Sequence, residues 1–277
     1  MNSPRIWLVT YPKSGTTWVR SMWSALEQDG KIDINELNSI NSSDRYWVEY
    51  TMGISTTFLD NAEIRLYQSE ACRYFFEAEH NQTLIKSHDA LIGEDEIEKP
   101  ILNQSNCDRI IHVIRDPRDI AVSCQYYFQI SLDRAIDMIC DSKCWLNTSR
   151  VYSTLPIFLS DWSAHTKSIF DSNLPSLLVR YEDLKQSSVK ELGRIVEFCQ
   201  LPYSNDAVRA AANSCNFQNL ALQERLVGYK NNPSQDTSRF FRRGESGNWR
   251  KVMSIAQVKR IIDKHGLVME SLGYLSD

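Results

Sequence analysis

The sequence predicts an α/β fold, a central parallel sheet flanked by helices, in a single domain spanning residues 1–277. A short apolar run with β-branched residues lies at Ile6–Val9, a second apolar run lies at Arg109–Ile114, and Ser176–Asp183 indicates another core strand followed by a polar turn. Such runs are typical of buried strands. Amphipathic segments of helical period separate them. Strands that alternate with helices favour a parallel sheet covered on both faces.

The stretch Ile6–Arg20 predicts a P-loop-like strand–loop–helix. After the first strand, Tyr11–Gly15 breaks the apolar pattern, because Pro12 lacks an N–H and Gly15 frees the backbone. From Thr16 an amphipathic helix follows. The free N–H groups at its start and the helix dipole point at one spot, which favours an anion and most often a phosphate. The side chains that would assist are one ammonium and three hydroxyls, those of Lys13, Ser14, Thr16 and Thr17.

This loop differs from the nucleoside-triphosphate loop. That motif needs two glycines with Lys after the second, whereas here Lys13 precedes Gly15, the loop's single glycine. The alternative interpretation is a surface turn that happens to contain a lysine. The strand before the loop, the helix after it and the hydroxyl residues around Gly15 favour an anion site.

Composition excludes several classes of protein. With 277 residues, 42 % hydrophobic and 24 % charged, the chain has a globular balance, and its net charge of −4 disfavours a nucleic-acid partner. The seven cysteines form no C-x-x-C pair and have no histidine neighbours that would complete a zinc pattern, which favours a reducing compartment. The first strand leaves no room for a signal peptide, and no apolar run could cross a membrane. We therefore expect a cytoplasmic protein without a membrane partner.

The remaining elements follow in order. The part from about residue 31 to 81 shows little pattern apart from a helix at Asn61–Phe76, and we interpret it as acceptor-side and lid material. Thr83–His88 predicts a short strand, and Pro117 suits the first turn of a helix that follows Arg109–Ile114. The long polar segment Gly228–Phe241 is expected to be a functional or mobile loop. Further helices are predicted at Asp133–Cys144, Pro156–Phe170, Val189–Cys199, Asn205–Ala212, Phe217–Leu226 and Ser254–His265.

Thr10-Tyr-Pro-Lys-Ser-Gly-Thr-Thr-Trp18 resembles the 5′-phosphosulfate loop of the sulfotransferases that use 3′-phosphoadenosine 5′-phosphosulfate (PAPS). The resemblance implies PAPS as the sulfuryl donor and adenosine 3′,5′-bisphosphate (PAP) as the product. It also implies that the loop from Lys13 to Thr17 holds the 5′ side of the nucleotide. Trp18 matches the residue that stacks on adenine, although core packing explains its place on the helix equally well.

Two further segments resemble the 3′-phosphate site of the same family. Within Val113–Ser123, the matching positions are Arg115 and Ser123, and a guanidinium fork suits phosphate. Without the resemblance, Arg115 could simply pair with a neighbouring aspartate. Within Arg239–Trp249, the resemblance implies that Arg242, Arg243 and Gly244 also bind the 3′-phosphate. Arg243 replaces a lysine and Asn248 an aspartate, and neither departure removes a cation. Tyr181 and Phe217 match residues near the adenine.

Lys86-Ser-His88 resembles the Lys-Thr-His of the small-molecule sulfotransferases, in which the histidine is the general base. An acceptor hydroxyl becomes a good nucleophile when a base removes its proton, and an imidazole does this near neutral pH. A lone histidine at a strand end is otherwise more often structural. The resemblance gives Lys86 a role at the sulfuryl oxygens and Lys13 one at the leaving nucleotide. It also implies that Ser123 is a catalytic residue. Asp89 departs from the family pattern, and it either raises the pKa of His88 or faces solvent.

Together these segments predict sulfuryl transfer from PAPS to a hydroxyl, or less favourably an amine, of a small molecule by in-line displacement. No metal is expected, because a sulfuryl group carries less charge than a γ-phosphate and Ile114 is followed by Arg115 rather than by a metal-binding aspartate. The alternatives are a P-loop kinase of small molecules and a non-catalytic PAP-binding protein.

The acceptor and the assembly are less defined. Aromatic residues in the segments 31–81 and 126–162 favour an apolar or aromatic alcohol, although core packing explains the same residues. The short N-terminus resembles bacterial rather than animal members of the family. Arg250–Lys259 matches the family's C-terminal dimer motif only loosely, and Lys259 reverses the charge of its closing acid, so the oligomeric state stays open.

Overall fold

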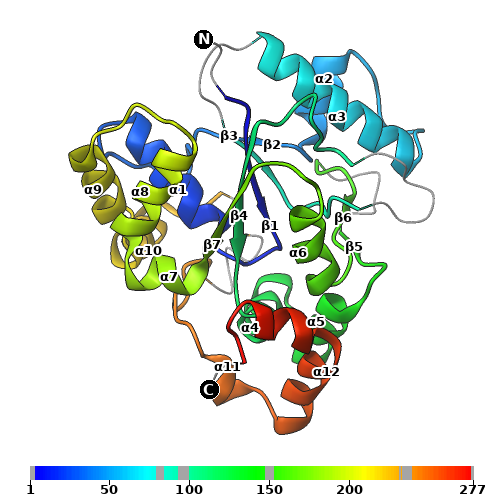
Figure 1. The fold of residues 1–277 in the computed structure, drawn as a ribbon, viewed down its shortest axis with the longest axis vertical. Coiled ribbons are helices and arrows are strands. Elements are labelled where there is room, and N and C mark those ends of the chain that lie inside the picture. Colours follow the sequence, from blue (N-terminus) through cyan, green and yellow to red (C-terminus); the bar gives the residue numbers. More distant parts are fainter. Residues whose placement is uncertain are drawn as a thin grey trace. The chain divides into compact units, whose positions relative to one another are not determined.

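The computed structural model describes residues 4–78, 84–92, 100–146, 153–230, 232 and 239–275. Within them a five-stranded sheet has the order β2-β3-β1-β4-β7, so β1 lies between β3 and β4 (Figure 1). Neighbouring strands from β2 to β4 are parallel. The parallel sheet predicted from the sequence is thus present. Its strands are β1 (Ile6–Thr10), β2 (Ile40–Asn41), β3 (Leu84–Ser87), β4 (Arg109–Ile114) and β7 (Ser176–Arg180).

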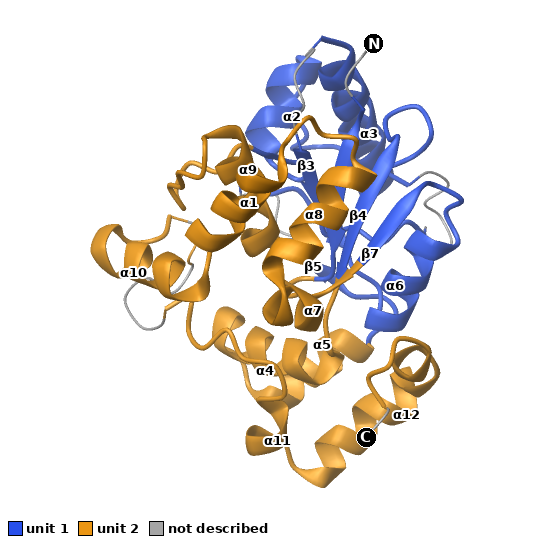
Figure 2. Ribbon diagram, turned by 60° about the vertical axis from the view of Figure 1, so that its left-hand side comes forward, with its two compact units in different colours: residues 1–11, 39–113, 141–178 blue, residues 12–38, 114–140, 179–277 orange. Residues whose placement is uncertain are grey.

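The chain forms two compact units, coloured separately in Figure 2. Unit 1 consists of Met1–Tyr11, Ser39–Val113 and Asp141–Leu178. Unit 2 consists of Pro12–Asn38, Ile114–Cys140 and Val179–Asp277. The chain passes from unit 1 to unit 2 immediately after β1, at the start of the predicted anion-binding loop.

Unit 1 packs its helices and sheet around a core built on β1. All five residues of β1 are buried, as the continuous apolar run predicts for a strand covered on both faces. Trp7 and Val9 share a cluster with Cys72 of α3 and Ile169 of α6. A two-stranded antiparallel sheet completes the unit. Its remaining elements are α2 (Arg45–Met52), α3 (Asn61–Ala78), β5 (Trp145–Leu146), β6 (Ile157–Phe158) and α6 (Trp162–Phe170).

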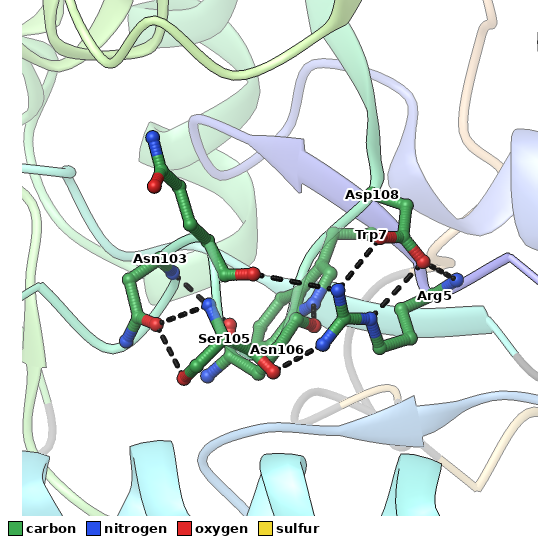
Figure 3. Close-up of polar contacts among 7 residues, drawn as sticks. Arg5, Trp7, Asn103, Ser105, Asn106 and Asp108 are labelled. Atoms are coloured by element: carbon green, nitrogen blue, oxygen red, sulfur yellow. Dashed lines mark hydrogen bonds and ion pairs between the residues drawn. The ribbon is translucent and has the colours of Figure 1, made fainter.

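A polar network closes the N-terminal ends of β1 and β4 (Figure 3). The Arg5 guanidinium donates to both carboxylate oxygens of Asp108, at 3.0 and 2.7 Å, and its side chain also reaches the Ser105 carbonyl. The indole of Trp7 donates to the Asn106 carbonyl at 2.9 Å. These contacts anchor the loop that leads into β4.

Unit 2 is helical. α1 packs against α9, α9 against α8, and α12 against α4 and α5. Arg260 of α12 forms an ion pair with Asp137 of α5, and Ser254 and Gln257 form a capping box at the start of α12. The helices are α1 (Thr16–Glu27), α4 (Pro117–Phe128), α5 (Leu132–Cys140), α7 (Tyr181–Gln186), α8 (Ser188–Phe198), α9 (Asn205–Ser214), α10 (Phe217–Val227), α11 (Trp249–Val252) and α12 (Ile255–Ser271).

Two predicted helices were wrong in part. α5 ends at Cys140 instead of Cys144, because a turn begins at Asp141. The Asp141 carbonyl accepts from the Cys144 N–H at 3.2 Å. The helix predicted at Pro156–Phe170 begins only at Trp162. Asp161 caps it by accepting from the N–H of the third residue, and the apolar residues before it form β6. A short apolar run does not distinguish a strand from a helix.

Other differences are smaller. The polar turn predicted to end at Asp183 is the helix α7, and the last helix runs on to Ser271. The helices α2 and α11 were not predicted. Half of the predicted loop Gly228–Phe241 lies outside the described residues. Among the helices described, none combines the length and the apolar character needed to cross a membrane.

Candidate functional site

The loop between β1 and α1 has the backbone of an anion site. Gly15 has a φ of 111° and Lys13 a φ of 70°, so two residues of the loop lie in the left-handed region. A non-glycine residue there is strained, and such strain often marks functional loops. No side chain of the described residues caps the N-terminus of α1. The buried Ser14 hydroxyl has no hydrogen-bond partner among them either. The loop therefore presents polar groups that an anion would satisfy.

Lys13 lies against aromatic rings in unit 2. Its Nζ is 4.0 Å from the centroids of both Tyr127 in α4 and Phe240. Burial, together with the positive charge of Arg115, lowers the pKa of Lys13 to about 7. An anion bound beside this ammonium would supply the charge that its surroundings lack.

Arg115 links three segments that are distant in the sequence. Its Nη1 donates to the Lys13 carbonyl at 3.1 Å and its Nη2 to the Glu245 carbonyl at 2.9 Å. The guanidinium also lies 4.3 Å from the Tyr181 ring. The alternative pairing with Asp116 is not formed, because Asp116 accepts from Arg118 at 2.7 Å. The other alternative, Asp119, makes no ion pair with Arg115 among the described residues, although the charge of Arg115 partly offsets the rise that burial causes in the pKa of the Asp119 carboxyl.

The segment from Arg242 to Trp249 is fixed by Asp119, a residue that was not predicted to belong to the site. The Asp119 carboxylate accepts from the N–H of Gly247 at 2.6 Å and of Trp249 at 3.1 Å. Asp119 lies in α4 one turn before Ser123, so both belong to one helix face. That spacing was the available signal. Asp119 holds the arginine-bearing segment beside α4.

Arg242 and Arg243 have different surroundings. Arg242 stacks 3.7 Å from the Tyr126 ring, and burial lowers its pKa, with the neighbouring Arg243 and Arg115 adding to the effect. Arg243 is exposed and donates to the Asn248 side chain at 2.8 Å. Arg243 and Asn248, the two departures from the family motif, are therefore hydrogen-bonded to each other. Because the Asn248 amide is neutral, it does not neutralise the charge of the Arg243 guanidinium.

The residues predicted to contact adenine lie together in unit 2. Trp18 and Tyr181 meet edge to face with centroids 5.8 Å apart, and the indole of Trp18 donates to the Cys215 carbonyl at 2.8 Å. Phe217 packs against Gly244, whose φ is +60°. A Cβ added at Gly244 would lie 2.3 Å from the Phe217 ring. Gly244 is therefore required both by the backbone and by the ring beside it.

His88 lies in unit 1, directly after β3. Its Nδ1 is 2.8 Å from the carbonyl of Thr10 and 3.0 Å from the Thr10 hydroxyl. A carbonyl can only accept, so Nδ1 carries the proton and donates. In the neutral ring Nε2 then holds the lone pair, which is the form a general base needs. Lys86 is half-buried in β3, two residues before His88.

Asp89 does not face solvent. It is buried and accepts from Arg65 of α3 at 2.7 Å, with both side chains 1 % exposed. Burial raises the pKa of the Asp89 carboxyl, while Arg65 and the Ser87 hydroxyl oppose that effect. No sequence motif pointed to Arg65. Its position in a buried stripe with Gln68 and Cys72 at helical spacing was the available signal.

The predicted site residues divide between the units. His88 and Lys86 belong to unit 1, and all the residues predicted to hold the nucleotide belong to unit 2. Over the ranges that the structure describes, no group of three or more His, Cys, Asp or Glu side chains could hold a metal ion.

Comparisons with known proteins agree on one family. The family model described as "Sulfotransferase domain" matches residues 3–270. The chain is 26 % identical to sulfotransferase 1E1 of Bos taurus, over 90 % of this chain and 78 % of that protein. It is also 26 % identical to cytosolic sulfotransferase 12 of Arabidopsis thaliana, over 92 % of this chain and 74 % of the relative.

Solved structures show the same fold. A mouse sulfotransferase complexed with PAP superimposes with a TM-score of 0.61 at 18 % identity, covering 100 % of this chain and 90 % of that one. A retinol dehydratase in complex with androsterone and the inactive cofactor PAP gives a TM-score of 0.63 at 18 % identity, covering 97 % of this chain and 81 % of that one.

Proposed function

Since the chain belongs to the sulfotransferase family, we propose that it transfers the sulfuryl group of PAPS to a hydroxyl of a small-molecule acceptor, with His88 as the general base. The single observation that supports the donor most is the bridge made by Arg115. It joins the loop at Lys13 to the segment at Glu245, two of the three motifs that resemble the PAPS site.

The residues present fit a nucleotide with phosphates at both ends. The buried hydroxyl of Ser14, the N-terminus of α1 and the ammonium of Lys13 suit the 5′ side. Arg115, Ser123, Arg242, Arg243 and Gly244 would hold the 3′-phosphate, and Trp18, Tyr181 and Phe217 the adenine. PAPS supplies an activated sulfuryl group bonded to a good leaving phosphate.

The proposed step is an in-line displacement at sulfur. The acceptor oxygen forms a bond to sulfur while the bond from sulfur to the bridging oxygen of the 5′-phosphate breaks, and PAP leaves. The acceptor proton passes to Nε2 of His88. Lys13 stabilises the charge that grows on the leaving phosphate, and Lys86 assists at the sulfuryl oxygens. Positioning and charge stabilisation supply most of the acceleration in such loose transition states.

We further propose that both units form one sulfotransferase domain, because the family model spans segments of both. A cytoplasmic location is proposed from the relative that is named cytosolic. For the acceptor we propose an apolar or aromatic alcohol, which is supported by the androsterone and retinol bound in structures of similar fold.

The test offers the purified protein sulfur-labelled PAPS or ATP labelled in its γ-phosphate. Each donor is combined with 2-naphthol and a panel of aliphatic alcohols, with and without EDTA. We expect label transfer from PAPS alone and no effect of EDTA. Magnesium-dependent transfer of phosphate would contradict the proposal and favour the kinase.

The His88→Ala variant separates catalysis from binding. We expect its turnover to fall by ~10²–10⁴-fold, the usual contribution of a general base, while its Kd for PAP stays within twofold of that of the wild type. A wild-type protein that binds PAP and sulfates no acceptor would favour the non-catalytic binder instead.

A further inference from the structure

The residue that follows the proposed base is the centre of a buried polar cluster in unit 1. One oxygen of the Asp89 carboxylate, Oδ1, accepts from Arg65 of α3 at 2.7 Å and from the Phe158 N–H of β6 at 3.1 Å. The other, Oδ2, accepts from the Ser87 hydroxyl at 2.9 Å. One carboxylate thus joins β3, α3 and β6 directly beside His88.

The main chain around His88 is held by residues of β6 and α6. The Ala90 N–H donates to the Phe158 carbonyl at 2.8 Å. His165 of α6 donates through Nε2 to the His88 carbonyl at 3.1 Å. The backbone at and after His88 is therefore fixed, while its ring is oriented by Thr10.

The elements that meet at Asp89 come from the two segments expected to form the acceptor pocket. α3 lies within 31–81, and β6 lies within 126–162. A buried ion pair is weak evidence for stability, because its desolvation cost offsets most of its attraction, and apolar replacements of similar volume are often tolerated. Its best-supported use is to specify one arrangement over others. The Arg65–Asp89 ion pair would fix the position of His88 relative to α3 and β6.

We propose that Asp89, held by Arg65, is a positioning residue that fixes His88 in register with α3 and β6. The proposal rests on the proposed role of His88 as the base. Asp89 does not touch the reacting atoms, and acts by keeping the Nδ1–H of His88 on the Thr10 carbonyl and its Nε2 lone pair toward the acceptor. A base displaced by about 1 Å can lose on the order of 10²-fold in rate.

Two double variants separate the hydrogen bonds between Arg65 and Asp89 from the charges of these side chains. Arg65→Met with Asp89→Leu replaces the pair by apolar side chains and removes the tie to β6. Arg65→Gln with Asp89→Asn is neutral but can still form the hydrogen bonds. The matched control is Arg73→Gln with Glu70→Gln, which removes a partly exposed ion pair from the same helix. Circular dichroism and thermal unfolding verify that each variant is folded.

Two readouts are used. Turnover of 2-naphthol with saturating PAPS gives kcat, and calorimetry gives the Kd for PAP. Nitrogen-15 NMR of the His88 ring reports which nitrogen carries the proton, and this measurement needs no acceptor. In the Met/Leu variant we expect kcat to fall ~10–100-fold, the Kd to stay within twofold, and the Nδ1–H form to give way to a mixture with the Nε2–H form. The Gln/Asn variant and the control should keep kcat within threefold and the Nδ1–H form.

Retention of the pure Nδ1–H form in a folded Met/Leu variant would overturn the proposal, whatever its turnover. So would a wild type whose His88 is already in the Nε2–H form. Failure of the proposed function has a different signature, since it is seen in the wild type as PAP binding without transfer to any acceptor. The NMR measurement decides on Asp89 in that case as well.

Discussion

Replacing Gly244 by alanine tests the contact between the segment proposed to hold the 3′-phosphate and Phe217, which is proposed to contact adenine. Gly244 has a φ of +60°, and an added Cβ would lie 2.3 Å from Cδ2 and 2.6 Å from Cε2 of Phe217. A non-glycine residue in the left-handed region costs roughly 1–2 kcal/mol. Moving the Phe217 ring off its rotamer costs about 1 kcal/mol more. We therefore expect Gly244→Ala to lose ~2–3 kcal/mol of folding free energy.

Gly53→Ala provides the matched control. Gly53 has a similar φ of +65° at the end of α2, and nothing lies within 4 Å of its added Cβ. This variant should lose only the backbone contribution, ~1–2 kcal/mol. The difference between the two variants isolates the displacement of Phe217, and should appear as a Tm about 2–4 °C lower for Gly244→Ala.

Nucleotide affinity gives the decisive measurement. Stacking of a base on an aromatic side chain contributes ~1–3 kcal/mol, so a displaced Phe217 should raise the Kd for PAP roughly 10–100-fold. Calorimetry on both variants measures this, and Gly53→Ala should bind like the wild type. If Gly244→Ala binds PAP within twofold of the wild type, Phe217 and Gly244 do not act together in the donor site.

Two further predictions concern pH. The pKa of Lys13, lowered to about 7 mainly by burial, should rise when PAP binds, so binding takes up a proton and the affinity should fall up to about tenfold per pH unit above pH 7. Calorimetry between pH 6.5 and 9 measures this, and a Lys13→Met variant that keeps the same pH dependence would contradict it. Burial lowers the pKa of His112 to about 3, whereas the unfolded histidine has a pKa of about 6.5. The free energy of unfolding should therefore not depend on the titration of this residue above pH 6.5, and should fall by about 1.4 kcal/mol per pH unit below that. Urea unfolding at several pH values should show a shallower fall for His112→Leu, and equal slopes would refute this role.

Local signals allowed much of the fold to be predicted. The start of β1 follows from an apolar run and the start of α1 from Gly15, although β1 extends one residue beyond the run to Thr10, and α4 begins at Pro117 as expected. The two-residue strands β5 and β6 exist only because they pair with each other, so nothing within either segment predicts them. Segments of this kind are determined by tertiary contacts, and the predicted helices around them were wrong in part.

The same distinction applies to the site. Residues such as Lys13 and Arg115 belong to motifs that can be recognised locally. The partner of Asp89 could not be found in this way, because Arg65 lies on another element and only the packing of α3 brings it within 2.7 Å. Asp119 was missed for the same reason, since its partners are backbone N–H groups of a distant segment.

The division of each unit into three separate stretches of chain has a consequence for synthesis on the ribosome. Unit 1 has all its segments once Leu178 has emerged, whereas α1 must await α9, whose residues end at Ser214, before its packing partner exists. Domains generally mature in the order in which their chain becomes complete. The half that carries His88 should therefore become protease-resistant first, and nascent chains stalled between these two points should expose the apolar face of α1 to chaperones.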